Sequence, residues 1–136
     1  MRGNFFGYET YIIVDGSLRN VVRNGKIEGF SVDLRLANYR GYLLSQIEDV
    51  RICVDKEWMK REFLRFKING REFTIDEMEH VTDERWGLLD VAVLTCLRPG
   101  GLSSGAHEIT VEEHMRPSYV PMTTVAWLTK TLQCAD

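Results

Sequence analysis

The sequence predicts an all-β protein: a single-domain antiparallel β-sandwich, jelly-roll-like, with at most one short helix. Short runs rich in β-branched and aromatic residues recur along the chain, and clusters of Gly, Asn, Asp and Pro separate them. Several runs alternate apolar and polar residues, as strands do when one face of their sheet is buried. Two sheets that bury their apolar faces against each other satisfy both observations.

Composition and charge place all of residues 1–136 in one globular domain. The chain is 44% hydrophobic and 27% charged, which is ordinary for a folded protein. Its net charge of −3 gives no electrostatic basis for nucleic-acid binding. No apolar run approaches the roughly 20 residues of a membrane helix, and the first residues lack a secretory-signal pattern. We therefore expect a cytoplasmic protein that binds neither nucleic acid nor membrane.

Two Asn-Gly dipeptides predict tight hairpins in the N-terminal half. Asn24-Gly25 and Asn69-Gly70 each lie between strand-like runs, and this dipeptide favours the type I′ turn because both central residues take positive φ. Residues 8–14 are rich in β formers and end at Asp15-Gly16, which predicts a first strand. The helix-start signal is the capping box Thr74-Ile75-Asp76-Glu77, after which only a turn or two of helix is expected.

The run Val91–Leu97 is the predicted centre of the core, because it is apolar, rich in β-branched residues and bounded by turn signals. Residues 106–112 alternate around Ile109 and Val111, so we expect the two runs to pair as a β-hairpin with a long loop. Pro117 lacks a backbone N–H, which predicts that the second strand ends early or lies at a sheet edge. Residues 125–128 fit either a short strand or a docked helix.

The chain carries no catalytic or metal-binding sequence pattern. Its histidines, His80, His107 and His114, lack the spacing of metal ligands, and its three cysteines form no CxxC pair. The acidic residues between Asp76 and Glu84 offer carboxylates of the kind used in glycoside hydrolysis. They follow a capping box, however, where acids favour the helix N-terminus and water, and a solvated face is the preferred interpretation.

Three polar and aromatic tips remain as candidate binding sites. Tryptophan and arginine are the residue types most enriched at interface hot spots, because they bury a large area and keep a hydrogen-bond donor. Two alternatives stay open: Tyr39 and Tyr42 of the first loop cap the end of the core, and the tryptophan of the second tip is a core anchor. The tips are Tyr39 with Arg40, Arg85 with Trp86, and Arg116 with Tyr119.

Several motifs in these segments occur together in one known family. In the C-terminal half they are Arg85-Trp86, Leu94-Thr95, Arg98-Pro99-Gly100-Gly101-Leu102, Gly105-Ala106-His107-Glu108 and Arg116-x-Ser118-Tyr119-x-Pro121. Upstream they are Gly29-Phe30-Ser31-Val32, Tyr39-Arg40-Gly41, Ile47-Glu48-Asp49-Val50 and Phe73-Thr74-Ile75-Asp76-Glu77-Met78. In these motifs the chain resembles the small β subunit of bacterial C-glycoside deglycosidases. The resemblance covers about residues 25–121 and leaves residues 122–136 as an extension.

The resemblance implies a division of labour within a hetero-oligomer. A larger α subunit, similar to a sugar phosphate isomerase/epimerase TIM barrel, carries the catalytic residues and a divalent metal, usually manganese. The complex cleaves the carbon-carbon bond between sugar and aglycone in 3-oxo-C-glycosides, flavonoid-type compounds among them, by elimination. The β subunit then holds no catalytic residue, metal or cofactor, and the three tips contact the partner or close its pocket.

The residues alone leave two other functional classes open. In a free-standing carbohydrate-binding sandwich, exposed aromatic rings stack on sugar without chemistry. In a structural homo-oligomer, copies of the chain associate through an exposed sheet.

Overall fold

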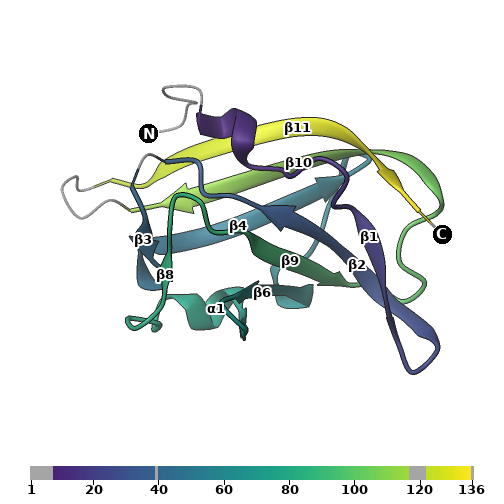
Figure 1. Ribbon diagram of the computed structural model, residues 1–136, viewed down its shortest axis with the longest axis horizontal. Helices are drawn as coiled ribbons and strands as arrows, with labels where there is room; N and C mark the ends of the chain where they lie inside the picture. Colours follow the sequence, from purple (N-terminus) through teal and green to yellow (C-terminus); the bar gives the residue numbers. More distant parts are fainter. Residues whose placement is uncertain (1–7, 39, 117–121, 136) are drawn as a thin grey trace.

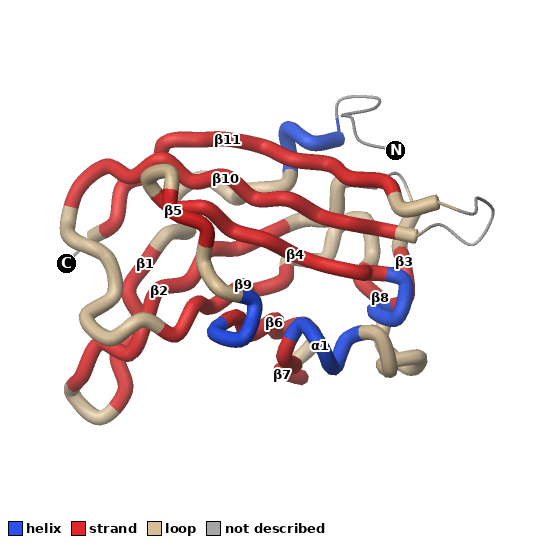
Figure 2. Tube along the Cα trace, turned by 180° about the vertical axis from the view of Figure 1, so that it is seen from behind, coloured by secondary structure: helices blue, strands red, loops and turns tan. Residues whose placement is uncertain are grey.

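The computed structural model describes residues 8–38, 40–116 and 122–135, and these form a β-sandwich (Figure 1). One antiparallel sheet has the order β1 (Arg19–Arg23), β2 (Lys26–Leu34), β9 (Ala92–Leu97), β6 (Leu64–Ile68) and β7 (Arg71–Thr74). The other has the order β11 (Thr124–Cys134), β10 (Gly105–Met115), β4 (Ile47–Val54) and β5 (Glu57–Trp58). Seen from behind, this second sheet forms one continuous layer (Figure 2).

Small elements complete the fold at the ends of the two layers. A two-stranded sheet pairs β3 (Tyr42–Leu43) with β8 (Arg85–Trp86). The helical segments are η1 (Tyr8–Tyr11), η2 (Leu44–Gln46), η3 (Arg61–Phe63) and α1 (Ile75–Met78). None exceeds a single turn or so, which confirms the prediction of an all-β sandwich with at most one short helix of consequence.

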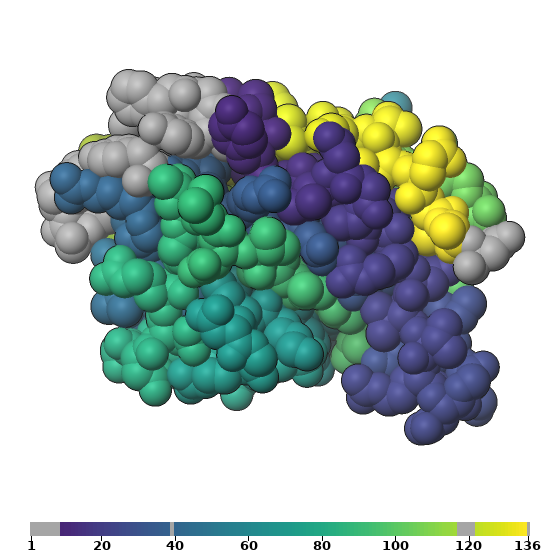
Figure 3. Space-filling model, in the orientation of Figure 1, coloured from purple at the N-terminus to yellow at the C-terminus, as the bar shows by residue number. Residues whose placement is uncertain are grey.

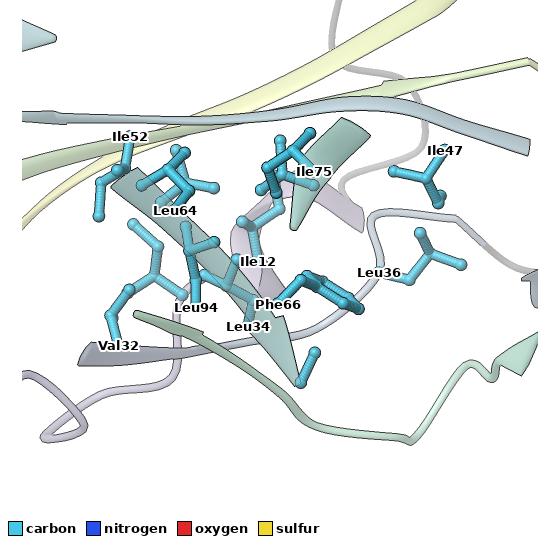
Figure 4. Packing of buried hydrophobic residues seen from close by; sticks show 14 of the residues in the cluster. Ile12, Val32, Leu34, Leu36, Ile47, Ile52, Leu64, Phe66, Ile75 and Leu94 are labelled. Atoms are coloured by element: carbon cyan, nitrogen blue, oxygen red, sulfur yellow. The ribbon is translucent and has the colours of Figure 1, made fainter. Parts of the chain in front are cut away.

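The core lies between the two main sheets. Figure 4 shows Ile52 of β4 on one side of this space and Val32 of β2 and Leu94 of β9 on the other. All three side chains are buried, together with Phe66 of β6. Burying one such side chain stabilises the fold by about 1.5–3 kcal/mol, so these inward positions hold the two layers together.

The locally encoded turns form as predicted. Asn24 and Gly25 have φ of 54° and 75°, and Asn69 and Gly70 have φ of 52° and 79°, as type I′ hairpins require. The capping box is also present: Glu77 N donates to Thr74 Oγ1 at 3.2 Å, and Thr74 N donates to Glu77 Oε1 at 2.7 Å. These bonds to Thr74 lower the pKa of the Glu77 carboxyl.

The first predicted strand, residues 8–14, is wrong. Residues 8–11 form the single turn η1, and only Ile13 makes an isolated bridge, to Leu34. Arg35 N donates to Ile12 O at 2.8 Å, so this segment lies against the end of β2. Ile12 and Ile13 are both buried. The β-forming composition therefore reflects burial of this segment and not membership of a sheet.

The predicted hairpin between residues 91–97 and 106–112 is also wrong, because the two strands lie in opposite sheets. β9 lies between β2 and β6, and residues 98–104 cross to the other sheet. Asn20 secures this crossing: its Nδ2 donates to Leu102 O, and Leu102 N donates to its Oδ1, both at 2.9 Å. Gly101 has φ of 61°, and a Cβ there would lie 2.2 Å from Asn20 Oδ1. Gly101 thus permits the close approach of Asn20 at the crossing, and the segment does not form a β-hairpin.

β10 neither ends early nor lies at an edge, contrary to the expectation from Pro117, which itself lies outside the described residues. The strand continues to Met115 and pairs with β4 on one side and β11 on the other. Its alternation persists, because Glu113 takes the inward position between Val111 and Met115. Residues 125–128, left open between strand and helix, belong to β11.

Glu113 is a carboxyl group inside the core. It is fully buried, and its Oε1 accepts a hydrogen bond from Ala37 N at 2.8 Å. Its Oε2 has no hydrogen-bond partner among the described residues. Burial raises the pKa of Glu113 to about 8, and the Ala37 bond opposes this shift only in part. The side chain is therefore mostly protonated at neutral pH.

His107 links two loops at the end of the sandwich where β10 begins. Its Nδ1 lies 2.6 Å from Asp55 Oδ2, and its Nε2 lies 2.7 Å from Ser103 O. A carbonyl and a carboxylate both accept, so this arrangement favours the protonated ring, in which both nitrogens donate. The bond to Asp55, and then the bond to Ser103, raise the pKa of His107, and the pKa of Asp55 is lowered in turn. His107 thus ties the 98–104 crossing to the turn after β4.

Replacing Glu113 should remove a pH dependence of stability. Its pKa is about 8 in the folded chain and about 4.5 in the unfolded chain, so ionisation destabilises the fold as pH rises between these values. The slope is at most about 1.4 kcal/mol per pH unit. We expect Glu113→Gln to unfold at higher urea than the wild type at about pH 9, and the gap to shrink at about pH 5. Glu108→Gln, an exposed change on the same strand, is the control. Parallel pH profiles for wild type and Glu113→Gln would contradict the assignment.

Replacing His107 should have the opposite pH signature. Its folded pKa lies above the ordinary 6.5, so its stabilisation is complete below pH 6.5 and fades as pH rises through the folded value. We expect His107→Gln to lower Tm most at about pH 6 and least at about pH 9, as thermal melts followed by circular dichroism would show. His80→Gln, at an exposed histidine, should leave Tm nearly unchanged. An equal loss at both pH values would exclude the imidazolium.

Candidate functional site

The described candidate residues gather at one end of the sandwich, at the left in Figure 1. We call it the β3 end and define it as residues 40–46, residues 84–91 and Arg116. Arg40, Arg85, Trp86 and Arg116 all belong to it, and Arg116 N donates to Gln46 O at 2.8 Å. The candidates Tyr39 and Tyr119 lie outside the described residues. Their predicted contact with a partner therefore stays a prediction.

Backbone pairing brings the first two tips together. Tyr42 pairs with Trp86 and Leu43 with Arg85. Arg85 Nη1 donates to Gly41 O at 3.1 Å and closes the loop before β3. A Cβ on Gly41 would lie 2.9 Å from Trp86 O, so only glycine allows this approach. This pairing places Arg40 and Arg85 at the same edge of the β3 end.

Trp86 is a core anchor, which was one of its two sequence interpretations. The residue is 0% exposed, and its ring meets that of Phe66 edge to face, with centroids 5.0 Å apart. Its Nε1 donates to Asp90 O at 3.0 Å. A partner or a sugar therefore cannot reach its ring, and any role of Trp86 in binding is to position the loop that follows it.

That loop is a tight turn with apolar side chains pointing outward. Gly87 N donates to Asp90 Oδ2 at 3.0 Å, and Asp90 N donates to Gly87 O at 3.1 Å. Leu89 is 85% exposed, and Leu88 and Val91 are also exposed. Figure 3 shows green atoms of this region standing on the surface. Sequence reasoning missed this feature, although an apolar Leu-Leu pair inside a Gly-to-Asp turn could have indicated it.

Arg116 and Arg40 are held by different means. Arg116 Nε lies 2.5 Å from Glu48 Oε1, and Thr123 Oγ1 donates to Glu48 Oε2 at 2.6 Å, so Glu48 orders the chain on both sides of residues 117–121. Arg40 N donates to Asn38 Oδ1 at 3.1 Å. Both arginine side chains lie at the surface of the β3 end, where a guanidinium can meet a carboxylate.

Ionisable groups elsewhere serve the fold. Among residues 8–38, 40–116 and 122–135, no three His, Cys, Asp or Glu side chains are arranged to hold a metal ion. Burial raises the pKa of the Cys96 thiol to about 11 and raises that of Cys53. Two arginines pair with most of the acidic cluster: Arg61 Nε bonds Asp76 Oδ1 at 2.6 Å, and Arg71 bonds Asp83 and Glu84. The cluster is thus an ion-paired surface.

No helix in the described ranges is long and apolar enough to cross a membrane.

Comparison with known proteins identifies the family. A sequence model of the C-glycoside deglycosidase beta subunit matches residues 8–119. A C-glycoside deglycosidase beta subunit from Eubacterium cellulosolvens is 34% identical over 114 residues, which is 83% of this chain and 78% of that protein. A 3'-dehydrocarminate deglycosidase beta subunit from Microbacterium sp. is 36% identical over 95 residues, 69% of this chain and 70% of that protein.

A further C-glycoside deglycosidase beta subunit, from Arthrobacter globiformis, is 30% identical over 109 residues, 80% of this chain and 79% of that protein. The match covers the strands from β1 to β10 and the β3 end, where the candidate residues lie, whereas β11 lies beyond it. This chain therefore belongs to the C-glycoside deglycosidase β-subunit family.

Proposed function

We propose that this chain is the non-catalytic β subunit of a C-glycoside deglycosidase and that it assembles with an α subunit through the β3 end. The observation that carries the proposal is the 87–91 turn. Hydrogen bonds between Gly87 and Asp90 close this turn, and three of its apolar side chains are exposed, Leu89 by 85%. Apolar side chains clustered beside arginine are typical of a surface that a partner covers.

The proposed partner is a barrel of the sugar phosphate isomerase/epimerase type that carries the catalytic groups. A divalent metal bound in that partner, manganese by preference, would supply Lewis-acid stabilisation of the keto group of a 3-oxo-C-glycoside, for example a flavonoid one. A base takes the C2 proton, the electron pair forms the C1–C2 double bond, and the C1–aglycone bond breaks. The aglycone carbon then takes up a proton. The enzyme class is accordingly a carbon-carbon lyase.

The proposed role of this chain is to support the α subunit and to exclude water from its pocket. Its own ionisable groups support that division, because they are engaged in folding. His107 uses both ring nitrogens to join two loops, and Glu113 lies inside the core. The buried thiols of Cys53, Cys96 and Cys134 suit a reducing compartment, which supports assembly in the cytoplasm.

A second candidate function, a free-standing carbohydrate-binding module, rests on different residues. Trp58 and Trp127 are partly exposed on the four-stranded sheet, and Arg51 stacks over the Trp58 ring at 4.4 Å. Saturable tryptophan quenching by a sugar, with no partner protein present, would favour this function. The β3 end would then have no part in it, because the ring of Trp86 is buried.

A charge on the 87–91 turn should break the complex. We expect Leu89→Asp to weaken binding of the α subunit at least about tenfold, because a carboxylate would be buried against an apolar surface. Biolayer interferometry with purified subunits would measure this. The control is Tyr11→Asp, a 58%-exposed apolar position on η1 that lies outside the β3 end. Equal affinities for wild type and Leu89→Asp would place the interface elsewhere.

The division of labour is tested by co-expression with an α-type partner and purification through a tag on this chain alone. We expect the partner to co-purify and the eluate to cleave a 3-oxo-C-glycoside when manganese is added. A chelator should abolish cleavage and leave the complex intact. Cleavage by the isolated chain would show that the catalytic groups lie in this subunit.

A further inference from the structure

The outer face of the five-stranded sheet contains a groove of about 480 Å³ that the β3 end does not include. Its lips are β1 on one side and β6 with β7 on the other, and β2 and β9 form its floor. In Figure 3 the surface is hollowed between the purple-blue lobe of β1 and β2 and the teal lobe of β6 and β7.

Strand register places arginines on both lips of this groove. Arg19 lies opposite Ser31, Ser31 opposite Thr95, and Thr95 opposite Arg65, so the four form one row across the sheet. The two hydroxyls in the middle bond each other at 2.6 Å. Three strand spacings separate the arginine backbones, or about 14 Å. That gap can hold one extended chain between two guanidinium groups.

The groove is positive on a chain whose net charge is −3. Four cationic side chains and two carboxylates line it. On one lip Arg19 pairs with Asp33 at 2.9 Å and Arg23 with Glu28 at 3.4 Å. On the other lip the cations are less neutralised, and this is where an anion is best attracted.

On that second lip, Arg65 Nη1 donates to the carbonyl oxygens of Glu62 and Leu64, both at 2.9 Å. No ion pair of Arg65 is found in the described residues, although its charge, after the hydrogen bonds to Thr74, contributes to lowering the pKa of Glu77. Lys67 has no hydrogen bond or ion pair within the described part of the chain, although Glu72 lies opposite it in the register. A cation without a close partner keeps its attraction for an incoming carboxylate.

The lining also restricts the kind of ligand. None of the described residues that line the groove is aromatic, so no platform for stacking a sugar or a nucleobase exists there. Long polyanions are disfavoured, because the overall negative charge repels them and two carboxylates stand on the lips. A short acidic peptide matches better, since arginine forks bind carboxylates in a bidentate manner.

We propose that this groove binds an extended acidic segment of the α subunit, as a second contact apart from the 87–91 turn. The identity of the partner rests on the proposed function, whereas the chemistry of the groove does not. Carboxylates of the segment would meet Arg65 and Lys67, and its backbone would lie over the Ser31 and Thr95 hydroxyls.

The first experiment uses the full chain alone and a fluorescent glutamate decapeptide, with binding followed by anisotropy. Lys67→Glu is compared with Lys60→Glu, an exposed lysine outside the groove; each takes the net charge from −3 to −5. We expect Lys67→Glu to weaken binding about tenfold and Lys60→Glu less than about twofold, with weaker binding at high salt. Lys67→Gln and Lys60→Gln repeat the comparison without a like-charge pair at Glu72.

Three results would overturn the proposal: no binding by the wild type, equal losses in the two lysine variants, or displacement of the peptide by inorganic phosphate at equal charge. The last would mark a general anion site only.

A second experiment separates this proposal from the proposed function. With purified α subunit, Lys67→Glu should raise Kd about tenfold at low salt, and Lys60→Glu should leave it unchanged. If the wild-type subunits assemble and Lys67→Glu binds equally well, the groove proposal fails and assembly stands. If the wild-type subunits do not assemble, the proposed function fails, and the partner assignment of the groove fails with it.

Discussion

The β3 end depends on the burial of one indole ring. Trp86 fills the space at this end of the sandwich, packs edge to face on Phe66 and donates its N–H to Asp90 O. That donation satisfies the only polar group of the ring, so the full apolar area can be buried without an unpaired donor. It also fixes Asp90, which in turn holds Gly87. The outward position of Leu88 and Leu89 is therefore a consequence of how the core is closed.

The two ends of the molecule are stabilised by different chemistry. At the end of the sandwich opposite the β3 end, two side chains join loops through short hydrogen bonds. Asn20 bonds the backbone of Leu102, and His107 bonds Asp55 and the carbonyl oxygen of Ser103. At the β3 end, the Trp86 indole N–H donates to Asp90 O, and the exposed side chains include Arg40, Arg85, Leu88 and Leu89. One end is thus joined by internal polar bonds, whereas the other exposes apolar and arginine side chains, as the proposed contact with a partner requires.

Local signals in the sequence predicted local structure well. The Asn-Gly hairpins and the Thr74 capping box formed because a few adjacent residues determine their φ angles and hydrogen bonds. The pairing of β9 was not local. Gly100-Gly101 suits a reversal and a sheet crossing equally, and only the contact with Asn20, far away in sequence, decides between them. Glu113 hid the alternation of β10, because a carboxyl at an inward position resembles the end of a strand.

The same distinction explains the candidate site. The sequence pointed to Arg40, Arg85 and Arg116, and the structure brings these three arginines to one end. Residue type alone could not show that the Trp86 ring points inward. Glu113 adds a connection that no motif could show. Its carboxyl holds Ala37 N, close in sequence to Arg40, from a strand in the opposite sheet. Ionisation would place a charge in the core directly beneath that loop. The segment that leads to Arg40 is therefore anchored by a residue of the four-stranded sheet.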